Sequence, residues 1–421
     1  MAPKLGRNVI ALSVVSFFTD VSSEMIYPLL PVFLSGVLGT SASFIGVIEG
    51  AAESTASLLK LASGWWSDRV RRRKPLVVAG YVIASVARPL VAIAQSAGQV
   101  LAIRLTDRVG KGIRSSPRDA LIADSVDASI RGRAFGFHRA ADHLGAVVGP
   151  LVAYGVLRWW QGASLRGVFW LAAVPGAIAV AVLILFVRER GRGAADGESG
   201  LPARGAPPEH HDTATAVLVP HPIPAPAIAP PLGRRFWAFL AVILLFTLGN
   251  STDAFLILRA TQLGVPVVLI PILWAMLHVV KSASSAPGGA LSDRLGRKPL
   301  IVTGWLLYAA VYFAFGAATA PWHAWALFAL YGVFFGLTEG TEKALVSDLV
   351  PAARRGAAFG WYNLAIGLGA LPASLLFGAV WDRAGAPTAF GMGAGFALLA
   401  ATAIAFVAPG RGSPGPTRAL S

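Results

Sequence analysis

The 421-residue chain contains no cysteine, and only 14% of its residues are charged. The lack of cysteine excludes disulfides, zinc–thiolate sites and thiol chemistry. Soluble domains carry about 25% charged residues, so the low fraction argues against water as the main solvent of the folded chain. No Gly-rich loop ends in Gly-Lys-Ser/Thr, so direct use of ATP is not expected. No constellation typical of a soluble enzyme is present either, and we expect no enzymatic activity.

Hydrophobic residues, in contrast, make up 55% of the chain, and the mean hydropathy is +0.64. Several apolar stretches reach the roughly 20 residues that a helix needs to cross a bilayer. The formal net charge of +15 raises the possibility of nucleic-acid binding. However, the arginines concentrate in short loops between apolar stretches, where positive charge orients membrane proteins. The composition therefore predicts a membrane protein without a nucleic-acid partner.

The apolar stretches predict an all-α protein with twelve transmembrane helices. We place the spans at 9–36, 42–65, 75–95, 98–125, 133–157, 167–187, 236–260, 266–287, 299–319, 323–350, 358–381 and 388–408. Basic residues cluster in the loops on one side, and the opposite loops hold little beyond Arg158, Arg166 and the Asp382-Arg383 pair. By the positive-inside rule, we expect a multi-pass protein of the cell (inner) membrane with both termini in the cytoplasm.

A segment rich in Pro, Gly and Ala separates the sixth span from the seventh. It predicts an N-terminal six-helix bundle at 1–187, a cytoplasmic linker at 188–235, a C-terminal six-helix bundle at 236–409 and a cytoplasmic tail at 410–421. His210 and His211 lie in the linker beside Glu209 and Asp212, which suggests a metal site. Polar tracts of this composition are more often solvated linkers, so we expect no metal site.

Two loop sequences repeat between the halves. Gly64-Trp-Trp-Ser-Asp68-Arg-Val-Arg-Arg72 matches Gly289-Ala-Leu-Ser-Asp293-Arg-Leu-Gly-Arg297, and the region after Asp124 matches that after Asp348. A repeated order of loops and spans indicates two related bundles that both start from the cytoplasm. In such proteins the substrate site lies between the bundles, near the bilayer midplane.

This doubled Gly-x-x-x-Asp-[Arg/Lys]-x-Gly-[Arg/Lys]-[Arg/Lys] loop resembles the signature of the major facilitator superfamily between helices two and three and between helices eight and nine. One departure is Arg71, which replaces the turn glycine present as Gly296. The resemblance implies two pseudo-symmetric six-helix bundles that alternate access. It also implies a conformational latch, in which we expect Arg72 to pair with Asp124 and Arg297 with Asp348. The residues of this latch would be Gly64, Asp68, Arg72, Asp124, Gly289, Asp293, Arg297 and Asp348.

Charged residues inside the spans are candidates for function because each is costly in hydrocarbon. Asp20 and Glu24 are four residues apart on one helical face, and so are Glu49 and Glu53. Two nearby carboxylates rarely ionise together, so such a ladder can carry a proton. The alternative is that Glu49 and Glu53 form structural salt bridges with Lys60 or Arg88.

The fourth span holds Arg104, Arg108, Arg114 and Arg118. Arg108-x-x-x-Gly112 resembles a motif of proton-coupled superfamily members, in which the arginine tunes the proton affinity of a nearby acid, and Arg104 is a rival for this role. Arg114 and Arg118 share a face where they would meet an anionic substrate. The alternative is that these arginines neutralise Asp107, Asp119 and the acids of the first two spans.

The fifth span contains Gly136, Gly145, Gly149 and Pro150 at a spacing that resembles a motif of superfamily exporters that exchange substrate for protons. The glycines allow close helix packing, and Pro150 allows a bend. The usual closing Gly-Gly pair is replaced by Ala153-Tyr154. On the first turns of this span we expect a local Arg139–Asp142 pair and a structural role for His143.

The second half offers Asp253, Glu339 and Glu342 as further cavity residues. Alignment of the halves places Arg118 opposite Glu342 and Asp119 opposite Lys343, which predicts bridges between the bundles. Tyr27, Phe255, Trp361 and Asn363 are candidates for ligand contacts or for packing.

Together these features predict a secondary transporter, a functional monomer that uses the proton gradient and needs no cofactor. We expect an antiporter that exports a small organic solute or metabolite, so its partners would be that solute, protons and the lipid bilayer. The alternatives are proton-coupled uptake of an anionic solute, which the arginines favour, metal-cation export through Asp20, Glu24, Asp253 and His278, and a membrane receptor with the same fold.

Overall fold

The computed structural model describes residues 6–67, 72–126, 131–160, 164–189, 232–351 and 354–407. Helices make up nearly all of these ranges, and they contain no β-strand. The helices are α1 (Arg7–Ile26), η1 (Tyr27–Leu29), α2 (Leu30–Gly36), α3 (Ala42–Ser67), α4 (Lys74–Ala87), η2 (Arg88–Ile93), α5 (Ala97–Asp124), α6 (Arg131–Trp159), α7 (Leu165–Leu171), α8 (Ala173–Phe186), α9 (Arg234–Gly249), α10 (Ala254–Gln262), η4 (Val267–Leu269), α11 (Ile270–Leu295), α12 (Arg297–Ala317), α13 (Pro321–Asp348) and α14 (Arg355–Val407).

Proline and glycine determine where the helices bend. The first span changes from α1 to the 3₁₀ turn η1 at Tyr27-Pro28, because proline lacks the backbone N–H that would continue the α-helix. Within α14, Gly385 has φ 82°, a left-handed conformation that only glycine adopts readily, so the helix turns back there between the last two predicted spans. Gly296 has φ 97° and ends α11, as the turn glycine of the second repeated loop was predicted to do.

Eight helical segments of the described chain are long and apolar enough to cross a membrane. The three other long helices, α3, α5 and α13, carry the charged residues that lower their hydropathy. The all-helical architecture and the multi-pass character are therefore confirmed. The boundaries proposed for the two bundles, the linker and the tail remain predictions, because most of 188–235 and nearly all of 410–421 lie outside the described residues, as do the linker histidines.

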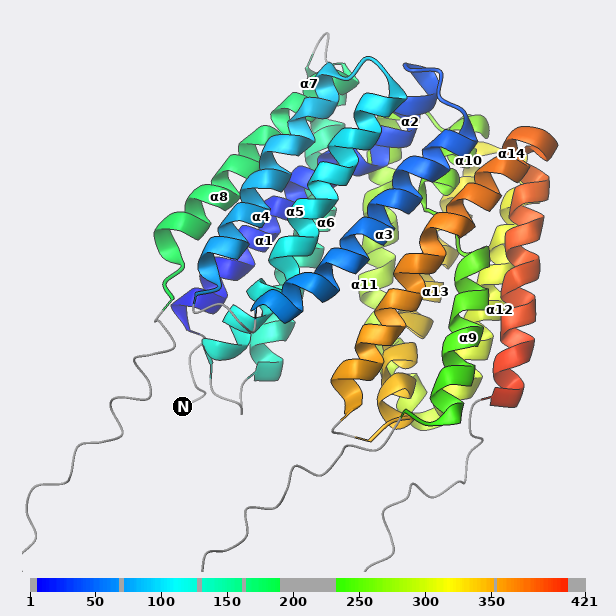
Figure 1. The fold of residues 1–421 in the computed structure, drawn as a ribbon. Helices are drawn as coiled ribbons and strands as arrows, with labels where there is room; N and C mark the ends of the chain where they lie inside the picture. Colours follow the sequence, from blue (N-terminus) through cyan, green and yellow to red (C-terminus); the bar gives the residue numbers. More distant parts are fainter. Residues whose placement is uncertain are drawn as a thin grey trace, which may run out of the picture.

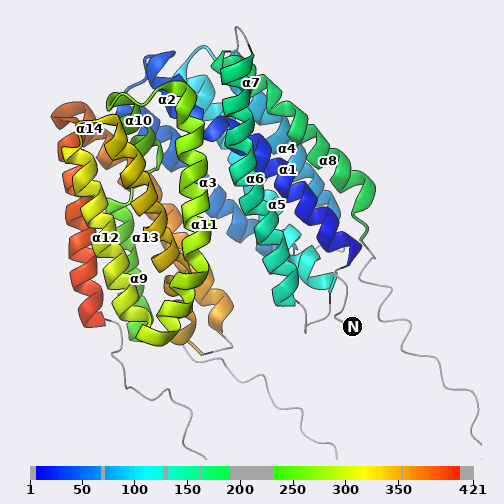
Figure 2. The same ribbon diagram turned by 180° about the vertical axis from the view of Figure 1, so that it is seen from behind.

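The helices form two groups that lie side by side. Figure 1 shows α1 to α8 in one group and α9 to α14 in the other, with α3 packed along α14. Seen from behind, in Figure 2, α6 lies next to α11. These two pairs of helices form the seams between the halves.

Glycines set the spacing of the α3–α14 seam. A Cβ on Gly50 would lie 2.8 Å from the Cα of Leu371, and one on Gly378 would lie 2.7 Å from the carbonyl oxygen of Ala42. A Cβ on Gly46 would also collide with the carbonyl of Ser374. Since glycine has no side chain, the two backbones are in direct contact along this line.

Aromatic side chains fill the core of the second half. Phe255 is fully buried and packs against Phe377 and Trp381, with ring centroids 4.6 and 5.7 Å away. Trp361 packs edge-on against Trp237. Of the two explanations left open for Phe255, packing is therefore the one that the structure supports.

Candidate functional site

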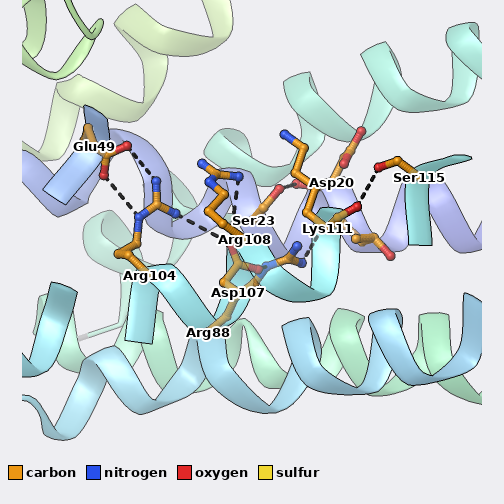
Figure 3. Close-up of polar contacts among 10 residues, drawn as sticks. Asp20, Ser23, Glu49, Arg88, Arg104, Asp107, Arg108, Lys111 and Ser115 are labelled. Carbon is orange, nitrogen blue, oxygen red and sulfur yellow. Dashed lines mark hydrogen bonds and ion pairs between the residues drawn. The ribbon is translucent and has the colours of Figure 1, made fainter. Parts of the chain in front are cut away.

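A network of buried ion pairs occupies the first half (Figure 3). The guanidinium of Arg104 donates two hydrogen bonds to Glu49, from Nε at 3.1 Å and from Nη2 at 2.7 Å. Arg88 donates to Asp107 at 2.8 Å and to the carbonyl of Thr19 at 3.0 Å. Asp107 is also 3.7 Å from Arg104 and 3.8 Å from Arg108. Each of these two acids is neutralised by at least one buried arginine, as charges in a low-dielectric environment require.

The partner of Glu49 distinguishes between two alternatives that the sequence left open. Glu49 pairs with Arg104 of α5, and neither Lys60 nor Arg88 is its partner. The sequence left this pairing open because it depends on how α3 and α5 are rotated against each other. The alternative in which the fourth-span arginines neutralise nearby acids is supported for Arg104 and Arg108.

Arg114 and Arg118 do not present a common anion-binding face. Arg118 donates to Asp119 at 2.8 Å and to Ser16 at 3.3 Å, so its charge is already paired. Arg114 is buried, and its guanidinium lies over the ring of Tyr81 at 4.3 Å. The expectation that both would meet an anionic substrate stays a prediction, which the pairing of Arg118 with Asp119 does not support.

Asp20 and Glu24 lie where α1 packs against α6. A Cβ on Gly145 would be 3.0 Å from the Cβ of Asp20, and one on Gly149 would be 3.0 Å from the Cβ of Glu24. The predicted acidic ladder of α1 thus meets two glycines of the predicted fifth-span motif. Among the described residues, no side chain hydrogen-bonds or ion-pairs with the carboxylate of Asp20, whose nearby charges belong to Asp142, Glu24, Lys111 and Arg114.

Glu24 connects the two halves. Its Oε2 accepts a hydrogen bond of 2.8 Å from the indole nitrogen of Trp274 on α11, and Nε2 of His278 is 4.0 Å away. The ring of Tyr27 packs on Trp274 at 5.2 Å. Glu24 retains 20% exposure of its side chain, so this inter-half contact is accessible to solvent.

The remaining candidate acids have different surroundings. Asp253 accepts a hydrogen bond of 2.7 Å from Tyr331, within the second half. Glu53 lies in the electrostatic field of Lys111, Arg108 and Lys60, but it forms no salt bridge with any of these three described residues. These two acids stay candidates for a role in transport.

The bridges predicted between the bundles are not formed in this structure. Glu339 pairs with Lys281 at 3.2 Å and with Lys343 at 3.0 Å, all within the second half. Glu342 accepts hydrogen bonds from Trp305 at 2.9 Å and from Tyr362 at 2.7 Å. These contacts, and the Arg118–Asp119 pair, use the charges that the alignment had assigned to opposite bundles.

A different contact ties the halves together at the end that carries α2 and α10. The carboxylate of Asp382 accepts hydrogen bonds from the backbone N–H groups of Ala42 at 3.0 Å and Ser43 at 2.9 Å. It thereby caps the first turn of α3 from the other half of the molecule. Further along the same seam, Ser54 donates to the carbonyl of Gly367 at 2.6 Å.

The second copy of the predicted latch is present. Arg297 lies 3.4 Å from Asp348, contacts Asp293 and donates to Ser292 at 2.6 Å. A Cβ on Gly289 would meet no atom within 4 Å. In the first copy, Asp68 and Arg71 lie outside the described residues, and so do the surroundings of Gly64 and the side chain of Asp124. The Arg72–Asp124 pair therefore stays a prediction, and so does the function of the latch. The surroundings of Gly136, of the fifth-span motif, are not described either.

Three functional candidates were missed from the sequence: His138, Trp274 and Asp382. His138 is 2% exposed on α6, and its Nε2 is 3.7 Å from Asp142 Oδ1. The predicted Arg139–Asp142 pair is confirmed, at 3.5 Å. One face of α6 carries, in order, His138, Asp142, Gly145 and Gly149. This spacing could have indicated that His138 faces α1 and that the exposed His143 does not.

The described residues contain no group of three or more His, Cys, Asp or Glu that could hold a metal ion. The metal-export alternative therefore has no preformed site in this part of the chain. The carboxylates of α1 and the inter-half contact around Glu24 remain the strongest candidates for a functional site.

Comparisons with known proteins agree with this architecture. The chain is 33% identical over 384 residues to an uncharacterised MFS-type transporter of Methanocaldococcus jannaschii, covering 90% of this chain and 89% of that protein. It is also 33% identical over 115 residues to the multidrug resistance protein MdtH of Escherichia coli. That matched stretch covers 27% of this chain and 29% of MdtH. A bacterial homologue of the human lysosomal transporter Spinster, solved in an inward-facing and occupied conformation, superposes with a TM-score of 0.70 over 96% of both chains at 16% identity.

The family model of the Major Facilitator Superfamily matches residues 12–280 and 279–420. These two matches cover nearly the whole chain, in agreement with the doubled loop and the two groups of helices. The chain belongs to the Major Facilitator Superfamily and is a multi-pass membrane transporter.

Proposed function

We propose that this transporter is a proton-coupled antiporter that exports a small organic solute, with Asp20 as the acid that carries the proton. The observation that supports this role is the position of Asp20 in a membrane-spanning helix, beside Glu24 and without an ion-pair partner among the described residues. A carboxylate in this setting is costly when charged, so protonation removes the cost. Glu49 and Asp107 are unsuited to this role because each already forms a buried ion pair with an arginine.

Export of an organic solute is supported over uptake of an anion by the state of the arginines. Arg104 and Arg118 each pair with an acid of the same half, and Arg108 lies 3.8 Å from Asp107, so three of the four arginines of the fourth span already have an acidic partner. The fourth, Arg114, lies over the ring of Tyr81. The local similarity to MdtH, a multidrug resistance protein, agrees with export but covers a small part of the chain. The positive charge of the predicted cytoplasmic loops supports an orientation with both termini inside the cell.

The test is a proteoliposome assay with an imposed pH gradient and a panel of organic cations, organic anions and divalent metals. We expect an organic solute to move across the membrane in the direction opposite to the flow of protons. The Asp20→Asn variant is expected to lose accumulation driven by the gradient and to keep solute exchange at equal pH. Asp20→Glu, which restores a carboxyl group, is the matched control and should retain coupling. Gradient-driven transport that survives in Asp20→Asn would show that another group carries the proton.

A further inference from the structure

The ionisable residues of the α1–α6 seam continue beyond Asp20. On α6, His138 and Asp142 precede Gly145 and Gly149 on the same face, and both glycines contact α1. His138 is 2% exposed and Asp142 is 8% exposed, although α6 begins at an end of the bundle. The seam therefore holds, in order, Glu24, Asp20, Asp142 and His138.

Asp142 and His138 have unused hydrogen-bonding capacity. Among the described residues, neither ring nitrogen of His138 has a hydrogen-bond partner, and Oδ1 of Asp142 has none either. Their separation of 3.7 Å is too long for a direct hydrogen bond but small enough to be closed by a side-chain rotation or bridged by water. Buried polar atoms that lack partners are costly, so their presence in a pair needs an explanation.

Electrostatics links this pair to Asp20. Asp142 lies within electrostatic reach of Asp20, as do Glu24, Lys111 and Arg114. The geometry agrees, because Gly145, about one turn after Asp142 on α6, packs directly on α1 at Asp20.

Other charges surround the pair from the helices packed against it. From α5, Arg118 and Asp119 act on His138, and Arg118 also reaches Ser16 of α1. On α6 itself, Arg139 is 3.5 Å from Asp142 and 68% exposed, which brings the pair close to solvent. The pair thus has Asp20 within electrostatic reach and an exposed residue, Arg139, beside it.

We propose that Asp142 and His138 transfer protons between Asp20 and the solvent-exposed end of α6. This inference rests on the proposed role of Asp20 as the proton carrier. When a proton moves from Asp20 to solvent, the carboxyl of Asp20 releases it to the carboxylate of Asp142. Asp142 then passes the proton to Nε2 of His138. The imidazolium then loses it to water near Arg139, and uptake follows the reverse order. Histidine suits the terminal position because each of its ring nitrogens can accept or donate a proton.

The test needs no substrate. Transient currents are recorded on the full chain in proteoliposomes adsorbed to a solid-supported membrane after a rapid pH jump. We expect wild-type protein to give a charge displacement that Asp20→Asn largely removes. His138→Gln should keep the total displaced charge and slow the current decay about tenfold. His143→Gln, the same substitution at an exposed position of the same helix, is the matched control and should decay at the wild-type rate.

A second variant separates the relay from a structural effect. Asp142→Asn should slow the decay to a similar extent, and the double variant should be no slower than either single variant, because both lie on one path. If His138→Gln fails to fold, as judged by thermal unfolding, the Asp142→Asn rate decides the question. Wild-type decay rates in folded His138→Gln or Asp142→Asn overturn the inference but leave the role of Asp20 intact. A wild-type current in Asp20→Asn instead refutes the role of Asp20, and the relay with it.

Discussion

Removal of the Asp382 carboxylate should shift the balance between conformations of the two halves. Asp382 is part of the second half, and its two hydrogen bonds, of 3.0 and 2.9 Å, cap the first turn of α3 in the first half. Loss of a helix cap costs about 1 kcal/mol. The favourable interaction of a carboxylate with the positive end of the helix adds about 0.3–1 kcal/mol, and we take the lower part because Asp382 is exposed.

The sum, about 1.4 kcal/mol, is lost only in the conformation in which these ends touch. A free-energy change of this size corresponds to a factor of about ten in an equilibrium constant. We therefore expect Asp382→Ala to raise the ratio of separated to closed ends about tenfold. The same substitution should have a smaller effect on the stability of each half, since the cap spans both.

The absence of cysteine makes this measurement direct, because two introduced cysteines are the only labelling sites. Spin labels at Val37→Cys and Val267→Cys, both at exposed positions of this end, report the distance between the halves by pulsed electron paramagnetic resonance. Arg383→Gln, a change of one charge at the next residue, is the control. An unchanged distance distribution in Asp382→Ala, with the protein still folded, would refute the reasoning.

Two further predictions concern packing and buried charge. Gly145→Ala should destabilise the protein by about 1–3 kcal/mol, because the added Cβ would lie 2.5 Å from the carbonyl oxygen of Phe17. Gly391→Ala is the control and should be neutral or stabilising, because its Cβ would meet no atom within 4 Å. Thermal unfolding of the two variants measures the difference, and equal midpoints would contradict the prediction. Glu49→Gln should cost about 3–5 kcal/mol because it leaves the guanidinium of Arg104 buried without its carboxylate. Simultaneous Arg104→Met should recover part of that loss, and purely additive losses would count against direct pairing.

The sequence was sufficient to predict the elements but not their contacts. The length of an apolar run and the position of proline and glycine are local properties, so the spans, the turn at Gly296 and the local Arg139–Asp142 pair could be predicted. The Arg297–Asp348 pair could be predicted as well, because the family signature carries it. Apart from the Arg297–Asp348 pair, which joins α12 to α13, these features do not depend on how one helix is rotated against another.

Partner choice among buried charges does depend on that rotation. Glu49 is one of several acids near several arginines, and only the packing of α3 on α5 selects Arg104. Likewise, the choice between His138 and His143 follows from which face of α6 meets α1. Contacts between the halves, such as that of Asp382 with α3, also depend on the conformation of the transporter. One sequence is therefore compatible with more than one set of contacts between the halves.

The glycines of the α3–α14 seam have a consequence for lipid access. Gly46, Gly50 and Gly378 bring the two backbones into contact, so no acyl chain or lipophilic molecule fits between these helices. From Ala42 to Ser57, where Gly367 contacts α3, the contact extends over roughly 20 Å at the rise of an α-helix, which is most of the hydrocarbon thickness. In this conformation, a hydrophobic solute dissolved in the bilayer therefore has no lateral entrance between α3 and α14. It must approach from the side of α6 and α11 or from water.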